Sequence, residues 1–278
     1  MLNLMYITNK PNIARIAEEA GVDWIFVDME FLGKDTRQGG LDTVQNHHTV
    51  ADVKNIKATL QKAKILVRVN PIHEELDNYM SSKDEINQVI GAGADIIMLP
   101  FFKTVEEVES FVNMVNGRAK VCLLLETPEA AEVLSQIVTV PGIDMIHIGL
   151  NDMHLALGMS FMFELLADGY VDYWCKIIKD AGIQYGFGGL ASLDGGVIPG
   201  RMILKEHYRL ESQSVILSRS FCNADLIHDL QEIKRIFVQG IKDIRKLEEE
   251  CQLQTSHWFN LNQIKMRNLV KEYVCMGC

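Results

Sequence analysis

Short runs of apolar and β-branched residues recur along the chain, and between them lie stretches whose apolar positions repeat with helical spacing. Several runs are apolar at consecutive positions, as parallel strands buried on both faces are. We count eight such runs, at residues 2–8, 22–28, 64–69, 94–100, 119–126, 143–149, 183–187 and 214–220. The pattern therefore predicts a parallel sheet in which strands alternate with helices.

The segments between the runs carry the signals of helix ends. Amphipathic stretches predict helices at residues 12–20, 50–62, 104–115 and 128–138. Thr49 and Asp52 have the spacing of a capping box, and Pro128 suits the first position of a helix. A glycine that can end a helix through a left-handed backbone precedes four of the predicted strands: Gly21, Gly93, Gly142 and Gly182.

Eight strands alternating with helices predict an α/β fold of the (β/α)8 type, a TIM barrel formed by residues 1–253. The alternative fold is a doubly wound open sheet. Such a sheet would have fewer strands and a glycine-rich loop after its first strand, and residues 8–12 do not form such a loop. Residues 254–278 lie beyond the barrel as a C-terminal helical extension that carries Trp258 and Phe259. We expect this extension to be an interface in a homo-oligomer or to be partly disordered.

The amino-acid composition indicates which binding partners the protein is expected to have. The chain of 278 residues has 27 basic and 37 acidic side chains and a net charge of −10, so it would repel nucleic acid. No apolar run reaches 18 residues, and the first ten residues lack the order of a signal peptide, which predicts a cytoplasmic protein without a membrane partner. The six cysteines are scattered, and Cys275 and Cys278 have no second pair with which to bind zinc.

The active site of such a barrel lies at the carboxyl ends of its strands. Polar residues follow five of the predicted strands: Asp28, Glu30, Arg68, Asn70, Glu126, Thr127, Asn151, Asp152, Ser218 and Arg219. Glu126 and Asp152 offer carboxylate oxygens with no neighbouring His or Cys, which favours Mg²⁺ or Mn²⁺ over zinc. A 2-oxo acid could bind such a cation while Arg68 stabilises the enolate with two parallel hydrogen bonds. Alternatively, both carboxylates cap helices and Arg68 merely pairs with one of them.

The motifs around these residues resemble a known family. They run in order as Gly21-Val22-Asp23-Trp24 to Asp28-Met29-Glu30, Leu66-Val67-Arg68-Val69, Gly93-Ala94-Asp95 to Leu99-Pro100, Leu124-Leu125-Glu126-Thr127, and Ile148-Gly149-Leu150-Asn151-Asp152 with Gly158. Over about residues 15 to 225 the chain is similar to the HpcH/HpaI aldolase and citrate lyase beta-subunit family, metal-dependent barrels of the phosphoenolpyruvate/pyruvate superfamily. The two carboxylates keep the family's spacing of 152 − 126 = 26 residues.

The resemblance implies a set of roles. Glu126 and Asp152 would bind the metal, and Arg68 would hold the carbonyl and enolate oxygens. The resemblance also implies a reversible aldol or Claisen-type cleavage that has pyruvate or a comparable small acid as one half. The residues then expected to bind the substrate are Arg68, Leu99, Pro100, Asn151 and Glu30. Leu99 and Pro100 would form the back wall of the substrate pocket.

One position departs from the family pattern. Aldolases of this family have Asp-x-Glu-His after the second strand, with the His in proton transfer, whereas this chain reads Asp28-Met29-Glu30-Phe31. His47 and His48, at the end of an unusually long loop, are candidate catalytic replacements, although two histidines in a polar loop can also be simply exposed.

Other groups suggest further roles. Lys34 and Arg37 on the same loop could close over an anionic substrate or be solvated charges. Gly186, Gly188, Gly189 and Arg219 lie where many barrels bind phosphate, although turns and a salt bridge would explain them equally well.

The leading hypothesis is a Mg²⁺- or Mn²⁺-dependent carbon–carbon lyase that acts on a 2-oxo acid through a pyruvate-like enolate. The first alternative is a CoA-thioester lyase of the citryl or malyl type, in which Arg37 or Arg219 would contact the nucleotide. The second is a non-catalytic barrel that binds a metal and a small acid, which Phe31 suggests.

Overall fold

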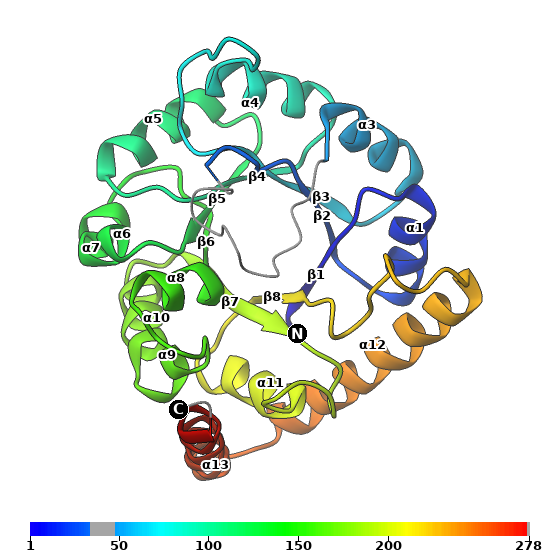
Figure 1. Cartoon of the computed structure of the whole chain (residues 1–278), viewed down its shortest axis with the longest axis vertical. Helices are drawn as coiled ribbons and strands as arrows, with labels where there is room; N and C mark the ends of the chain where they lie inside the picture. The colour runs from blue at the N-terminus through cyan, green and yellow to red at the C-terminus, as the bar shows by residue number, and fades with distance from the viewer. Residues whose placement is uncertain (34–47, 277–278) are drawn as a thin grey trace.

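Eight parallel strands close into a barrel in which each strand pairs with the next and β8 pairs with β1, and the helices surround it (Figure 1). The computed structural model describes residues 1–33 and 48–276. The strands are β1 Asn3–Ile7, β2 Trp24–Asp28, β3 Lys64–Arg68, β4 Ile96–Leu99, β5 Lys120–Leu125, β6 Met145–Ile148, β7 Gln184–Leu190 and β8 Ser214–Leu217. The predicted (β/α)8 fold is confirmed.

Helices connect the strands and continue after β8. They are α1 Pro11–Ala20, α3 Val50–Thr59, α4 Ser82–Gly91, α5 Val105–Val115, α6 Pro128–Glu132, α7 Leu134–Ile137, α8 Leu150–Ala156, α9 Glu164–Ala167, α10 Tyr170–Asp180, α11 Gly200–Arg209, α12 Leu230–Gln252 and α13 Ser256–Met276. No helix in the described parts of the chain is long and apolar enough to cross a membrane.

The predicted helix ends are present. Thr49 and Asp52 form a reciprocal capping box at the start of α3, and Pro128 begins α6. Gly21, which ends α1, has a left-handed backbone with φ of +105°. The helix predicted over residues 128–138 is instead divided at Val133, whose φ of −102° and ψ of 12° are not helical.

Side chains alternate between two apolar layers, as the period of a strand requires. In β2, Trp24 and Phe26 belong to the cluster that fills the barrel, whereas Ile25 and Val27 belong to the core between strands and helices. Asp28 continues the inward series at the carboxyl end of β2. Leu124 is likewise inward-facing in β5, and Glu126 follows two residues later. The strand period therefore brings polar side chains to one rim of the barrel.

β7 differs from the prediction. The apolar run predicted a strand that ends at residue 187, but β7 continues to Leu190 through Gly186, Gly188 and Gly189. Pairing with β8 shifts register between Gly186 and Gly189, and Gly188 has φ of +51°. Glycines carry no side chain that could show a strand's alternation, so the sequence pattern could not reveal this half of the strand.

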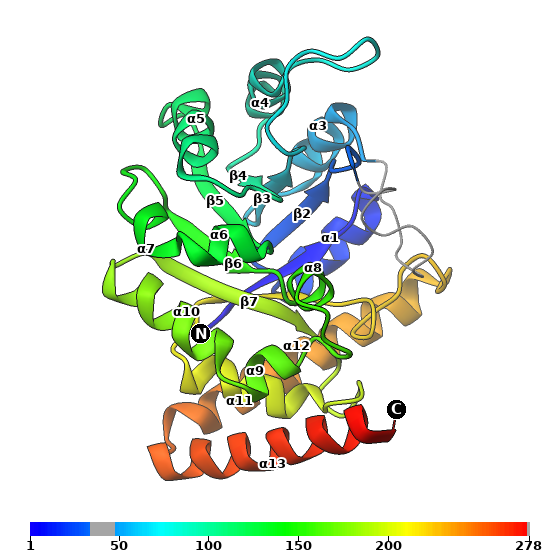
Figure 2. The same cartoon turned by 60° about the vertical axis from the view of Figure 1, so that its left-hand side comes forward.

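The C-terminal segment forms the long helix α13, which Figure 2 shows along the lower edge of the barrel. α13 packs against α11 and α9 through the buried side chains of Asn262, Met266 and Val270. The Asn262 amide donates to the Met202 carbonyl at 3.1 Å and to the Glu206 carboxylate at 2.7 Å. The extension thus docks on its own barrel, while the homo-oligomer stays a prediction.

Candidate active site

A cavity of about 340 Å³ lies at the carboxyl ends of the strands, where a barrel of this kind has its active site. Its polar and charged lining comes from several strand ends: Tyr6, Asp28, Arg68, Glu126, His147, Asn151, Asp152, Ser218, Arg219, Asn223 and Asp225. Phe26, Leu124 and Ile216 provide apolar walls. Four of the residues predicted for the site, Arg68, Glu126, Asn151 and Asp152, therefore meet on one cavity.

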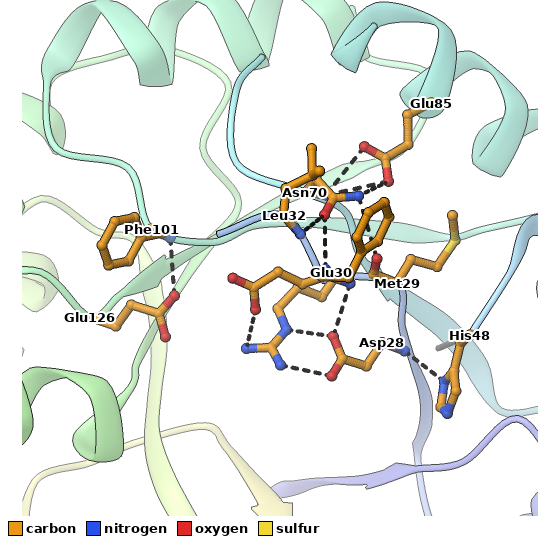
Figure 3. Close-up of polar contacts among 11 residues, drawn as sticks. Asp28, Met29, Glu30, Leu32, His48, Asn70, Glu85, Phe101 and Glu126 are labelled. Carbon is orange, nitrogen blue, oxygen red and sulfur yellow. Dashed lines mark hydrogen bonds and ion pairs between the residues drawn. The ribbon is translucent and has the colours of Figure 1, made fainter. Parts of the chain in front are cut away.

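Arg68 ends β3 directly opposite Asp28, its register partner in β2. Its Nε and Nη2 atoms donate to the two Asp28 carboxylate oxygens, each at 2.8 Å, and Nη1 lies 3.2 Å from Oε2 of Glu30. The guanidinium also lies over the Phe26 ring, 5.7 Å from its centroid. Figure 3 shows Asp28 and Glu30 directed toward the same centre. Arg68 is thus held in place before any substrate arrives.

Arg68 keeps its positive charge although it is buried. Burial alone would lower the pKa of its guanidinium, but the Asp28, Glu30 and Glu126 carboxylates raise it well above the usual value. Two of the five guanidinium N–H groups donate to Asp28, and the Nη1 atom forms an ion pair with Glu30. The N–H groups that do not donate to Asp28 are the ones available to a ligand in the cavity.

Glu126 and Asp152 meet at the rim of the cavity. Glu126 follows β5 and is 3% exposed, while Asp152 stands in the first turn of α8. Burial raises the pKa of Glu126 well above its usual value, and the neighbouring Glu30 and Asp152 raise it further, Asp152 also by a hydrogen bond with Glu126. Two carboxylates held together in a buried place are costly without a cation.

The donor set fits a hard divalent cation. Among residues 1–33 and 48–276, no three His, Cys, Asp or Glu side chains form a group suited to a metal ion. Glu126 and Asp152 are a pair of oxygen donors, and Mg²⁺ is commonly held by one or two carboxylates with its other positions open to water or substrate. A cation between them would also offset the repulsion that raises the pKa of Glu126. These two residues would hold Mg²⁺ or Mn²⁺.

Backbone groups on two sides hold the Glu126 side chain in its position. The Phe101 N–H donates to Oε1 of Glu126 at 3.0 Å (Figure 3), and Phe101 has a left-handed backbone with φ of +49°. A non-glycine residue rarely adopts that conformation, so strain is retained where it aims a donor at the site. On the other side, a Cβ atom on Gly149 would lie 2.9 Å from the Glu126 Cβ. Gly149 is therefore required for the close approach of α8 to Glu126.

A buried network supports the turn after β2. The Asn70 side-chain oxygen accepts from the N–H groups of Phe31 and Leu32, each at 2.9 Å, and its amide donates to Glu85 at 2.9 Å (Figure 3). Tyr79 also donates to Glu85 at 2.9 Å. Burial raises the pKa of Glu85 despite these bonds. The sequence pattern marked Asn70 as a strand-end residue, but Glu85 in α4 gave no signal beyond an ordinary acidic first turn.

His48 lies at the end of β2 but does not line the cavity. Its Nδ1 atom accepts a hydrogen bond from the Asp28 N–H at 3.0 Å (Figure 3), which places the proton of the neutral ring on Nε2. In this arrangement the Nδ1 lone pair is engaged by the Asp28 backbone. The predicted partner residue His47, and the possible lid residues Lys34 and Arg37, lie outside the described residues.

Three other predicted substrate contacts are placed away from the cavity lining. Leu99 is fully buried in the core between strands and helices, because its position in β4 points outward. Its expected role behind the substrate is therefore not met by its side chain. Pro100 is buried and also absent from the lining, and Glu30 reaches the site through Arg68.

His147 does line the cavity, although strand position alone suggested a core histidine. Its Nε2 lies 3.2 Å from the Gly188 carbonyl oxygen, and burial lowers its pKa to about 4. The ring is therefore neutral near pH 7. Its inward place in β6, two residues before Gly149, is the signal that could have identified it.

Comparison with curated proteins finds a relative with a similar sequence. A 4-hydroxy-2-oxovalerate aldolase from Novosphingobium aromaticivorans is 25% identical over 177 residues, which are 54% of this chain and 60% of the relative. The match thus spans less than two thirds of that curated relative.

Solved structures share the fold. An HpcH/HpaI aldolase/citrate lyase family protein from Burkholderia cenocepacia J2315 has a TM-score of 0.62 at 16% identity, covering 84% of this chain and 94% of that one. The citrate synthase SbnG has a TM-score of 0.58 at 17% identity, covering 84% and 92%.

The family assignment comes from a match along the sequence itself. The model of the HpcH/HpaI aldolase/citrate lyase family matches residues 3–164, which is more than half of the chain and includes Arg68, Glu126 and Asp152. The chain therefore belongs to the HpcH/HpaI aldolase/citrate lyase family.

Proposed function

We propose that this protein is a divalent-metal-dependent carbon–carbon lyase of the aldolase type that acts on a 2-oxo acid. The observation that carries the proposal is the convergence of Glu126, Asp152 and Arg68 on one cavity of about 340 Å³. A relative named 4-hydroxy-2-oxovalerate aldolase supports the same class of substrate. Mg²⁺ or Mn²⁺ held by the two carboxylates would supply Lewis-acid polarisation of the substrate's keto group.

Arg68 has the central role among the chain's own residues. Cleavage or formation of a bond next to a keto group places negative charge on the keto oxygen. The N–H groups of Arg68 that do not donate to Asp28 can donate to that oxygen. Because Asp28 fixes the plane of the guanidinium, these donors are oriented before the charge develops, which favours the transition state over the ground state.

The rest of the cavity positions the substrate. Phe26 and Leu124 give it an apolar floor that lowers the local dielectric and strengthens the bonds made by Arg68. Asn151 is an exposed residue of the lining beside Asp152 and would contact the substrate's carboxylate.

The first experiment follows the methyl protons of pyruvate by NMR in deuterated water, with Mg²⁺ or Mn²⁺ added. Wild type should exchange these protons, and Glu126→Gln should not, since the amide is a poorer ligand for the cation. As a separate test of binding, oxalate resembles the pyruvate enolate and should raise the melting temperature only together with the metal. Absence of exchange and of joint stabilisation with either metal would overturn the proposal.

A non-catalytic barrel is the alternative that Phe31 supports. The Phe31 ring packs edge-on against Tyr79, with centroids 4.8 Å apart, and does not line the cavity. That alternative predicts stabilisation by metal and oxalate without any proton exchange. The two experiments together therefore separate an enzyme from a binding protein.

A further inference from the structure

The turn that follows β2 carries one of the carboxylates that contact Arg68. Residues 29–32 continue the chain after Asp28, and Glu30 among them lies 3.2 Å from Nη1 of Arg68. The Glu30 N–H also donates to Oδ1 of Asp28 at 3.3 Å, the same oxygen that accepts from Nε of Arg68. A shift of this turn would therefore disturb both carboxylates that orient the guanidinium.

Asn70 holds the turn on both sides of Glu30. Its side-chain oxygen accepts from the N–H groups of Phe31 and Leu32, each at 2.9 Å, and its NH₂ group donates to the Met29 carbonyl oxygen at 3.4 Å. Asn70 is fully buried, so water does not compete for these bonds. The bonds form only when the amide oxygen faces the two N–H groups, so the orientation of this amide decides the conformation of the turn.

Glu85 sets the orientation of that amide. Its Oε1 accepts from the Asn70 NH₂ group and from the Tyr79 hydroxyl, each at 2.9 Å, and its Oε2 accepts from the Asn70 backbone N–H at 3.2 Å. Because both carboxylate oxygens act as acceptors, they select the NH₂ side of the amide and direct the Asn70 oxygen to the turn (Figure 3). With the amide reversed, two oxygens would face each other and two backbone donors would lose their acceptor.

Glu85 is not the residue that caps its own helix. The Ser81 hydroxyl caps α4 by accepting from the Asp84 N–H, whereas Glu85 lies in the first turn with a fully buried side chain. Burial of a carboxylate costs free energy, and it raises the pKa of Glu85. The three donors named above, which offset this cost, belong to Asn70 and Tyr79. The interactions of this buried carboxylate are thus directed to the group that holds the turn.

We propose that Glu85 is a positioning residue for Arg68 and acts through Asn70 and the turn that carries Glu30. The Glu85 carboxylate fixes the Asn70 amide, the amide fixes residues 29–32, and Glu30 then limits rotation of the guanidinium. The N–H groups of Arg68 that do not donate to Asp28 thereby keep one direction in the cavity that Arg68 lines. The effect on turnover rests on the proposed lyase function, whereas the effect on Arg68 belongs to the free protein.

The first experiment measures the free protein and needs no substrate. Hydrogen exchange followed by NMR reports how often the hydrogen bond of a single N–H group opens. In Glu85→Gln, an NH₂ group replaces one acceptor oxygen and weakens the hold on Asn70. We expect the Phe31 N–H and the Arg68 Nε–H to exchange at least about fivefold faster than in wild type. Unchanged exchange at both groups, or faster exchange at Phe31 alone, would overturn the proposal.

A double-mutant cycle with Arg68→Lys tests the same coupling in turnover. The rate measured is the exchange of pyruvate methyl protons with Mg²⁺ or Mn²⁺ present. Glu85→Gln should lower this rate about tenfold beside Arg68 but less than about twofold beside lysine, because an ammonium group has no plane to orient. A role of Glu85 in stability alone would lower the rate by the same factor in both backgrounds, and that result would contradict the proposal.

Glu18→Gln is the matched control. The Glu18 carboxylate also accepts from three donors, the backbone N–H groups of Gln61, Lys62 and Ala63, but these precede β3 and lie outside the cavity lining. This variant should change neither the exchange of the Arg68 Nε–H nor the pyruvate rate by more than about twofold. An effect as large as that of Glu85→Gln would show that the loss is not specific to the network at Asn70.

Tyr79→Phe provides a milder variant in case Glu85→Gln does not fold. It removes the hydroxyl that donates to Glu85 and retains the ring that packs against Phe31. We expect the Phe31 N–H and the Arg68 Nε–H to exchange about twofold faster, since one of the three donors to Glu85 is lost. Faster exchange at Phe31 without any change at Arg68 would again contradict the proposal.

Failure of the lyase proposal would give a different result. If wild type exchanges no pyruvate protons with either metal, the lyase function is wrong, and hydrogen exchange at Arg68 still decides whether Glu85 positions it. If wild type exchanges these protons and Glu85→Gln acts equally in both backgrounds of the cycle, the lyase function stands and the proposed role of Glu85 is wrong.

Discussion

The two rims of the barrel each hold a partly buried arginine between two carboxylates, and they use it differently. At the carboxyl rim Arg68 contacts Asp28 and Glu30. At the amino rim Arg245 of α12 contacts Asp23 at 2.9 Å and Glu248 at 2.7 Å. Composition and geometry are therefore similar at both ends of the same molecule.

The surroundings of the two arginines differ. At the amino rim the remaining partners belong to the protein itself: Glu248 accepts from the Leu2 N–H at 2.6 Å and from the Tyr208 hydroxyl at 3.1 Å, and Arg245 donates to the Leu2 carbonyl oxygen at 2.8 Å. These contacts fasten α12 to the first strand. At the carboxyl rim Arg68 faces a cavity that also contains Glu126 and Asp152. A charged cluster is thus a candidate functional site when some of its groups face a cavity that a ligand can enter. When all of its groups contact the protein itself, its role is to stabilise the fold.

The largest contrast should come from the two buried glutamates. Glu126→Gln should lower kcat about a thousandfold, because the cation ligand is lost, and should leave the melting temperature within about 2 °C. The amide can still accept from the Phe101 N–H, and a buried like charge is removed. Steady-state kinetics and thermal unfolding would measure the two effects.

Glu248→Gln provides the matched control at the other rim. We expect it to reduce the free energy of unfolding by about 2 kcal/mol, through the weakened contact with Arg245, and to leave kcat at 25 °C nearly unchanged. Loss of activity in Glu248→Gln, or unfolding of Glu126→Gln, would break the comparison.

Substitution of the two arginines should show the same contrast with smaller effects, on activity for Arg68 and on stability for Arg245. Arg68→Lys should lower kcat about a hundredfold, since a point charge cannot replace the planar group that Asp28 orients. Arg245→Lys should instead cost about 1–2 kcal/mol of stability, an amount reduced by the partial exposure of that site. Urea denaturation and initial rates on both variants would show whether each effect stays at its own rim.

A smaller effect concerns a buried histidine away from both rims. His207 stacks on Phe187 at 3.8 Å, and burial lowers its pKa from 6.5 to about 3. Between those pH values the unfolded state binds the extra proton and the native state does not, so stability falls as pH decreases below about 6.5. His207 should therefore cost about 2 kcal/mol between pH 7 and 5. Urea denaturation at both pH values should show a correspondingly smaller loss in His207→Gln.

The smallest effect is expected at Phe31. The ring contacts Tyr79 rather than the cavity, so Phe31→His should change the rate of pyruvate proton exchange less than about threefold. Phe31→Leu is the control for loss of the aromatic contact. A gain of tenfold or more with histidine alone would show that proton transfer is limiting at this position, and that the chain is a weakened aldolase.

Much of the fold and of the site could be read from the sequence. Apolar runs and capping residues identify the eight strands, and the position of a residue after a strand determines the rim at which it lies. Asp28, Arg68, Glu126 and Asp152 were predicted in this way, and all four line the cavity. That inference needs only the strand period and the common direction of parallel strands, which are local properties of the chain.

Closure of the barrel decided the contacts among those residues. The pairing of Arg68 with Asp28 depends on the register between β2 and β3, and the Phe101 N–H reaches Glu126 only because β4 and β5 are neighbours. The outward direction of Leu99 and the attachment of His48 to the Asp28 N–H likewise depend on packing. The sequence by itself determined which chemical groups arrive at the rim, through local periodicity. The tertiary structure decided which of them are engaged and which remain for a ligand, because hydrogen bonds between distant segments depend on how the whole barrel packs.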